Sequence, residues 1–169
     1  MTQSTPAGNG EAVQEIIVGV LLPLSSDYAA GGEESKAAIE VAAGDINDYF
    51  TSIGSDYRVR VILEDTRTDP AVALEKLEAL DEQGVKIVIG FGTSTELEAA
   101  RAYADEHGII LISTMSTAPL LAIAGDNAYR FVPPDTYQAG AIAYYLRADG
   151  IAAVVPLWRG DAWGDELKL

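Results

Sequence analysis

Two short segments rich in serine and threonine hydroxyls each follow an apolar run in this chain. The first, GFGTST, occupies 90–95 and follows the run at 87–89. The second, STMSTAP, occupies 113–119 and follows the run at 109–112. Hydroxyls and free backbone N–H groups of this kind bind small anions such as carboxylates. Neither segment contains an acidic, basic or thiol side chain, which indicates capture of a ligand rather than catalysis.

The elements that flank these two loops determine where they must lie. Both apolar runs have the length and composition of buried parallel strands, and a helical pattern at 96–107 follows the first loop. Open α/β sheets bind ligands at the carboxyl ends of their strands. A helix N-terminus at that edge adds partial positive charge and unpaired donors. We therefore expect both loops at one edge of a sheet, facing a small anion.

Strand and helix patterns alternate along the chain ahead of these loops. Asp69 and Pro70 are typical of a helix start, with an aspartate N-cap and a proline at the first helical position. The alternation predicts an α/β fold with an open parallel sheet and helices on both faces. The expected elements before the loops are a strand at 16–22, a helix at 33–49, a strand at 57–64 and a helix at 69–83.

After Pro119 the pattern changes. A short extended piece at 129–132 is halted by two prolines, and a predicted helix then ends at Arg147. A buried strand is predicted at 151–157. The paired prolines are typical of a crossover between two lobes. We expect three parts: a flexible tether at 1–15, a first ligand-binding lobe at 16–132, and a crossover with the start of a second lobe at 133–169.

The composition excludes several kinds of partner and site. With 11 basic and 26 acidic residues the formal net charge is −15, so the protein would repel nucleic acid and anionic membranes. Cysteine is absent, and His107 is the one histidine, which excludes thiolate or zinc centres and a catalytic triad. No apolar run approaches the ~20 residues that span a bilayer. We expect no metal, no cofactor and no enzymatic activity.

The order of motifs resembles the type I periplasmic solute-binding proteins, in particular the group that resembles the leucine/isoleucine/valine-binding proteins. The resemblance covers nearly everything from Ile16 onward, and it rests on the order and spacing of the motifs rather than on any single one. The matching stretches are IVGVLLPLS at 17–25, GGEE at 31–34, DIN at 45–47, EDTRTDP at 64–70, IG at 89–90, STAP at 116–119, YRF at 129–131 and DAWG at 161–164.

The resemblance implies how a ligand would be held. Members of the family hold the carboxylate and ammonium of an amino acid through two βα loops of the first lobe, and an aromatic residue of the second lobe closes over the ligand. Met115 is bulkier than the residue the family often has there, which would alter ligand size or orientation. The expected ligand-binding residues are Ser94, Thr95, Met115, Ser116, Thr117, Trp163 and Tyr28.

Simpler interpretations of the same residues stay open. The loop hydroxyls could cap helices and satisfy turns, Met115 could fill the core, and Tyr28 could be an ordinary exposed loop residue. The GFG sequence at 90–92 also resembles a dinucleotide fingerprint, although its third glycine is missing. The main alternative is therefore a nucleotide-binding domain of flavodoxin or Rossmann type. The acidic residues near the helix start at Asp69 are expected to end a strand and to cap the helix rather than to bind a cation.

The resemblance implies an extracytoplasmic, tethered solute-binding protein that captures an amino acid or a related polar molecule by lobe closure. It would deliver the ligand to an ABC-type permease or sense it. Family members are about twice as long, so we expect this chain to be a fragment, with a natural half-receptor as the alternative. An unfinished second lobe would expose Ile142, Leu146 and Val154. From this we expect a homodimer or a swapped assembly.

Overall fold

The computed structural model describes residues 13–167 of the chain. Most of the expected tether at 1–15 lies outside the described residues. The first strand begins at Gln14, two residues before its predicted start, so Gln14 and Glu15 belong to the sheet.

Five parallel strands form the sheet: β1 (Gln14–Leu22), β2 (Tyr57–Asp65), β3 (Ile87–Gly90), β4 (Ile110–Ser113) and β5 (Ala128–Arg130). Their order is β2-β1-β3-β4-β5, and each neighbouring pair is parallel. The predicted open parallel sheet is therefore confirmed, and the extended piece after Pro119 forms its last strand. All five carboxyl ends lie at the same edge.

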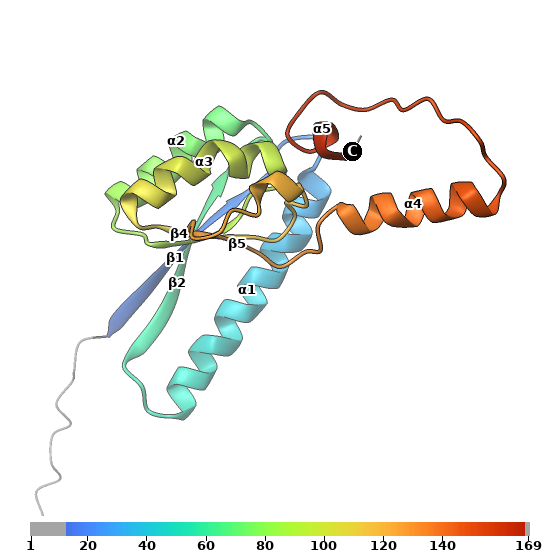
Figure 1. Ribbon diagram of the computed structural model, residues 1–169. Coiled ribbons are helices and arrows are strands. Elements are labelled where there is room, and N and C mark those ends of the chain that lie inside the picture. Colours follow the sequence, from blue (N-terminus) through green and yellow to red (C-terminus); the bar gives the residue numbers. More distant parts are fainter. Residues whose placement is uncertain (1–12, 168–169) are drawn as a thin grey trace, which may run out of the picture.

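Helices lie on both faces of this sheet, as predicted (Figure 1). The helices of the structure are α1 (Ala29–Ser52), α2 (Pro70–Glu82), α3 (Ser94–His107), α4 (Thr136–Ala148) and α5 (Gly164–Leu167), and α1, α2 and α3 are the ones that cover the sheet. Helices α2 and α3 pack side by side over one face, and α1 runs obliquely across the other. Asp69 caps α2 as expected, because its carboxylate accepts from the backbone N–H groups of Ala71 and Val72.

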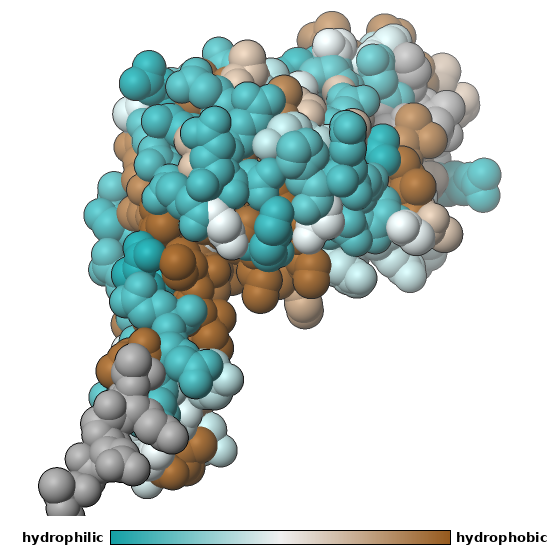
Figure 2. Space-filling view, turned by 90° about the vertical axis from the view of Figure 1, so that its left-hand side faces the viewer, coloured by the Kyte–Doolittle hydropathy of each residue, from teal (hydrophilic) through white to brown (hydrophobic). Residues whose placement is uncertain are grey.

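The main core lies between the sheet and the α2–α3 layer. Leu77 and Leu80 of α2 and Leu97 of α3 are fully buried there against Val88 and Leu111 of the strands. The opposite face is only partly covered. In α1 the apolar residues Ile46 and Tyr49 remain 41% and 61% exposed. Figure 2 shows apolar side chains below the mostly polar upper part of the view, and along the narrow part of the molecule that extends to the lower left.

The predicted strand at 151–157 is wrong. These residues have no regular secondary structure, and Val155 and Leu157 are 96% and 99% exposed. A strand is stable only when a neighbouring strand satisfies its backbone groups, and within the described residues this segment has none. Helix α4 was predicted correctly, but it projects away from the sheet (Figure 1). After α4 the chain loops back, and α5 lies near the start of α1.

Candidate functional site

The strand order creates a crevice at the carboxyl edge. From β1 the chain passes to α1 on one face, and from β3 it passes to α3 on the other, so the loops that follow these neighbouring strands diverge. Such a switch point is where open α/β sheets bind ligands. A hollow of about 190 Å³ lies there, lined by Tyr28, Gly92, Thr93, Ser94, Met115, Thr117, Arg159 and Trp163.

The turn between β3 and α3 is tightly specified. Gly90 has φ +136°, and a Cβ there would lie 2.0 Å from the Leu21 carbonyl oxygen, so only glycine fits. Phe91 also has positive φ, 65°, although it is fully buried in the core. A bulky residue in this region of φ is costly and is kept only where its surroundings impose it. The strain turns the chain so that Gly92 and the start of α3 face the crevice.

Thr93 caps the first turn of α3, and the T-x-x-E spacing of Thr93 and Glu96 is that of a capping box, although Glu96 bonds the Thr93 hydroxyl rather than its backbone N–H. The Thr93 hydroxyl accepts from the Glu96 N–H at 3.3 Å and donates to its carboxylate at 2.9 Å. Glu96 is fully buried beneath the loop. This cap fixes where the N-terminal end of α3 meets the crevice.

Two serines from different loops form a buried hydroxyl pair. Ser116 donates to the Ser94 hydroxyl oxygen at 3.0 Å, and the Ala118 N–H approaches the same oxygen at 3.4 Å. Ser116 is itself held by its N–H, which donates to the Ser113 hydroxyl at 3.1 Å. Because Ser94 Oγ accepts two bonds from the protein, its own proton remains available to donate to a ligand.

Thr117 is oriented by Asp135, the residue before α4. Its hydroxyl donates to the Asp135 carboxylate at 2.7 Å, and the Asp135 N–H donates to the Thr117 carbonyl at 3.0 Å. Since the hydroxyl donates inward, its oxygen can accept from a ligand N–H or ammonium group. Met115 beside it is 38% exposed and lines the hollow, so it does not fill the core.

The loop after β1 is fastened to the end of β2 by Asp65. This carboxylate accepts from the Leu24 N–H at 2.8 Å, from the Arg67 N–H at 2.9 Å and from the Ser25 hydroxyl. Burial opposes ionisation of Asp65, but these hydrogen bonds outweigh it and lower its pKa. The loop that ends at Tyr28 is thereby held beside the crevice.

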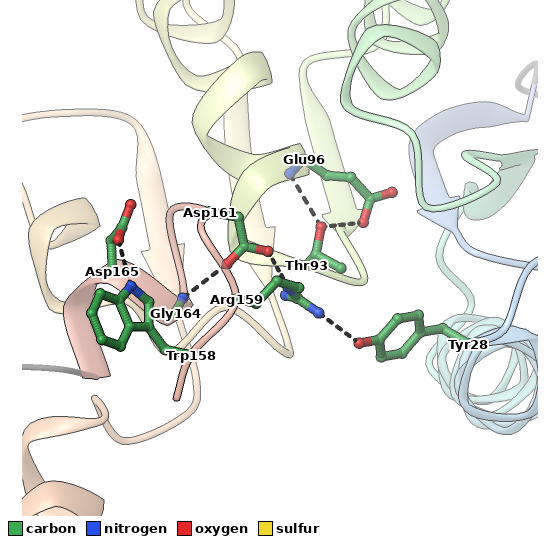
Figure 3. A network of polar contacts seen from close by, with 8 residues as sticks. All are labelled: Tyr28, Thr93, Glu96, Trp158, Arg159, Asp161, Gly164 and Asp165. Atoms are coloured by element: carbon green, nitrogen blue, oxygen red, sulfur yellow. Dashed lines mark hydrogen bonds and ion pairs between the residues drawn. The ribbon is translucent and has the colours of Figure 1, made fainter. Parts of the chain in front are cut away.

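Arg159 reaches the crevice from the segment after α4 (Figure 3). Its guanidinium lies between Tyr28 and Asp161: Nη1 donates to the Tyr28 hydroxyl at 3.3 Å and Nε donates to the Asp161 carboxylate. It also lies 5.3 Å from the centre of the Trp163 ring. The bond to Tyr28, followed by the Asp161 carboxylate, raises the pKa of Arg159, which stays protonated. Among the residues that line the hollow, Arg159 alone is charged.

The structure gathers most of the expected ligand residues. Tyr28, Ser94, Met115, Thr117 and Trp163 all line the one hollow. The other two differ. Ser116 is fully buried beneath Ser94. Thr95 lines an adjoining hollow together with Tyr28, Thr68, Pro70, Thr93, Arg159 and Asp161.

Three lining residues were not in the expected set. Gly92 and Thr93 belong to the first hydroxyl loop, and the capping-box spacing of Thr93 and Glu96 could have indicated the role of Thr93. Arg159 carries no comparable signal, because it lies in a stretch without periodicity. Metal binding gains no support, since no group of three or more metal-ligating side chains occurs within residues 13–167. Nor does that part of the chain hold a helix long and apolar enough to cross a membrane.

Comparison with known proteins identifies one matching family and several relatives of this chain. The family model described as "Periplasmic binding protein" matches residues 15–168. An uncharacterized protein of Methanocaldococcus jannaschii is 36% identical over 173 residues, covering 99% of this chain and 41% of that protein. Leu/Ile/Val-binding protein homolog 3 of Brucella melitensis is 27% identical over 138 residues, covering 80% of this chain and 36% of that protein.

Solved structures agree with this. An ABC transporter substrate-binding protein of Desulfitobacterium hafniense, solved in complex with Leu, superimposes with a TM-score of 0.69 at 25% identity. That match covers 92% of this chain and 45% of the solved one. This sequence thus spans about two-fifths of the length of the curated relatives it matches.

Proposed function

Because the chain belongs to the periplasmic binding protein family, we propose that it forms the carboxylate-binding part of an extracytoplasmic solute-binding protein. The solute is an amino acid or a related small polar molecule, and the role is capture without chemistry. The observation that carries this proposal is the position of Ser94, whose hydroxyl meets the crevice at the first turn of α3.

The carboxylate of the solute lies at the N-terminal end of α3 in this proposal. The Ser94 hydroxyl donates to it, and unpaired N–H groups of the helix start add partial positive charge. The Thr117 oxygen accepts from the ammonium group, because its own proton is committed to Asp135. Met115 and Trp163 supply apolar walls, which suits a solute whose two charged groups lie at one end.

Lobe closure retains the solute in this proposal. Tyr28, Ser94 and Thr117 belong to the first lobe, 16–132, whereas Trp163 belongs to the segment 133–169, the start of a second lobe. A ligand that contacts both parts favours the closed arrangement by its differential affinity for it. The relative of known structure bound to Leu is named as an ABC transporter substrate-binding protein, which supports delivery to an ABC-type permease. A membrane tether at the N-terminus completes the proposal.

Self-association is a separate proposal for the chain of 169 residues. Ile142 on α4 is 49% exposed and Val154 is 60% exposed, so both offer apolar surface to a second copy. The nucleotide-binding alternative gains no support, since the named relatives are described as binding proteins.

Isothermal titration calorimetry on the natural full-length protein tests the proposal, with the twenty common amino acids as the panel. We expect at least one of them to bind, and Ser94→Ala to weaken that binding by about tenfold or more, as expected for a lost hydrogen bond to a charged group. Ser52→Ala at the exposed end of α1 is the matched control. The proposal fails if no amino acid binds, or if Ser94→Ala and Ser52→Ala leave the affinity equally unchanged.

A further inference from the structure

Arg159 is shared by two hollows that lie next to each other. Ser94, Met115 and Thr117 line only the first, whereas Thr68, Pro70 and Thr95 line only the second. Arg159 lines both, as do Tyr28 and Thr93. The guanidinium therefore stands at the boundary of the two hollows, with its hydrogen bond directed to Tyr28 (Figure 3).

The guanidinium retains hydrogen-bonding capacity. Of its five N–H groups, one is used by Tyr28 and one by Asp161. Within the described residues no acceptor lies at Nη2. Asp161 neutralises part of the charge, but it is bound at Nε and also accepts from the Gly164 N–H at 2.8 Å. The Nη edge is the one that a carboxylate binds in a two-pronged contact.

The second hollow also offers a hydroxyl. Thr95, the second residue of α3, faces it, and the side chain has no hydrogen-bond partner among the residues described. Thr68 is different, because its hydroxyl is paired with that of Ser26. Neither hollow is lined by a free carboxylate, since Asp161 is paired with Arg159. A negatively charged group of a ligand in the second hollow would therefore meet hydrogen-bond donors and one cation, Arg159.

We infer that Arg159 and Thr95 form a second subsite that binds a second carboxylate of the solute, so that the protein selects short dicarboxylates over solutes with one carboxylate. This inference rests on the proposed function, because the first carboxylate is the one held at Ser94. Acidic amino acids and simple dicarboxylic acids both carry two carboxylates, so either class of solute fits the two subsites. Solutes of either kind carry their two carboxylates a few carbons apart, as two adjoining hollows require.

Calorimetry on the natural full-length protein distinguishes these solutes. The probes are L-glutamate, glutarate and L-norvaline, which has the same number of carbons as L-glutamate but lacks the second carboxylate. We expect L-glutamate or glutarate to bind at least about tenfold more tightly than L-norvaline. Preference for L-glutamate identifies an acidic amino acid, and preference for glutarate identifies a dicarboxylic acid.

Two variants test the subsite. Arg159→Gln and Thr95→Val should each weaken dicarboxylate binding, by about tenfold and about threefold, and change L-norvaline binding by less than about twofold. Arg159→Lys should restore part of the loss. Arg147→Gln, on exposed α4, is the matched control and should change nothing. Thermal melts of the variants establish that each one folds, and Thr95→Val tests the subsite without disturbing the Tyr28 and Asp161 contacts of Arg159.

Three outcomes overturn the inference. In the first, L-norvaline binds as tightly as the dicarboxylates. In the second, Arg159→Gln weakens all probes equally, which would mean that Arg159 binds the carboxylate at Ser94. In both cases the proposed function stands if Ser94→Ala still weakens binding by about tenfold or more. In the third, no probe and no common amino acid binds, and the proposed function fails as well.

Discussion

The Ser116 hydroxyl donates a 3.0 Å hydrogen bond to the Ser94 hydroxyl oxygen, joining two βα loops whose serines are 22 residues apart in the sequence. The pair is buried, and only Ser94 borders the hollow. In the proposed function Ser116 therefore acts on the ligand through Ser94, whose hydroxyl proton it directs toward the crevice. The two loop hydroxyls then have different roles in that proposal, because Ser94 binds the ligand and Ser116 positions Ser94.

Removing the positioning hydroxyl should weaken binding without abolishing it. In Ser116→Ala the Ser94 oxygen loses a donor, its proton can rotate away from the ligand, and affinity should fall by about threefold to tenfold, the value of one neutral hydrogen bond. Calorimetry measures the change. Ser94→Ala should cost more than Ser116→Ala, and an equal or larger effect of Ser116→Ala would contradict this order.

The Gly92 position should tolerate no side chain. A Cβ there would lie 2.6 Å from Pro23 Cγ, so alanine would push the loop after β1 away from the loop after β3. We expect Gly92→Ala to lower the melting temperature and to weaken ligand binding together, because overpacking of a tight contact costs about 1–3 kcal/mol.

Gly44→Ala in α1 is the control for this glycine. A Cβ there meets nothing within 4 Å, and alanine is favoured over glycine inside a helix by about 1 kcal/mol. Gly44→Ala should therefore leave the melting temperature unchanged or raise it. The prediction fails if Gly92→Ala melts at or above the temperature of Gly44→Ala.

A carboxylate far from the crevice should make stability depend on pH. Asp81 of α2 accepts from Lys86, from His107 at 2.6 Å and from Tyr103 at 3.1 Å. The bond to Lys86, followed by that to His107, lowers the pKa of Asp81 from 3.8 to about 2. The folded-state pKa is below the unfolded value. Its stabilisation is therefore fully present above pH 3.8 and is lost as the pH falls through about 2.

Urea unfolding of Asp81→Asn against the natural sequence measures this contribution. We expect the variant to be less stable at pH 5, and the difference to shrink steadily as the pH falls from 4 to about 2. Asp48→Asn, at an exposed position of α1, is the matched control for the loss of one carboxylate. A difference for Asp81→Asn that stays constant over this range would show that its ionisation is not responsible.

Self-association of the 169-residue chain should depend on α4. We expect light scattering to show dimers that become more abundant with concentration. Ile142→Glu should shift them toward monomers, because a charge replaces exposed apolar surface. Gln138→Glu, exposed on the same helix, adds an equal charge and should leave the dimer intact. A monomer at every concentration would refute the association.

The sequence by itself determined the elements whose signals are local. The apolar run before Gly90 predicted a buried strand, Asp69 with Pro70 predicted the start of α2, and the loop around Ser94 was expected at the carboxyl edge of the sheet, where it lines a hollow. These patterns depend on burial periodicity and on capping, which involve neighbours a few residues apart.

Only the tertiary structure decided features that depend on distant partners. Arg159 and Tyr28 are 131 residues apart, and no local pattern indicates that a guanidinium would reach the crevice. The apolar run at 151–157 looks like a buried strand, yet without a neighbouring strand among the described residues it has no regular secondary structure and stays exposed. The hydrophobic effect favours burial of apolar side chains, but only the rest of the fold decides whether a surface is available to cover them. That is why the loops were predictable and Arg159, which lines the same hollow, was not.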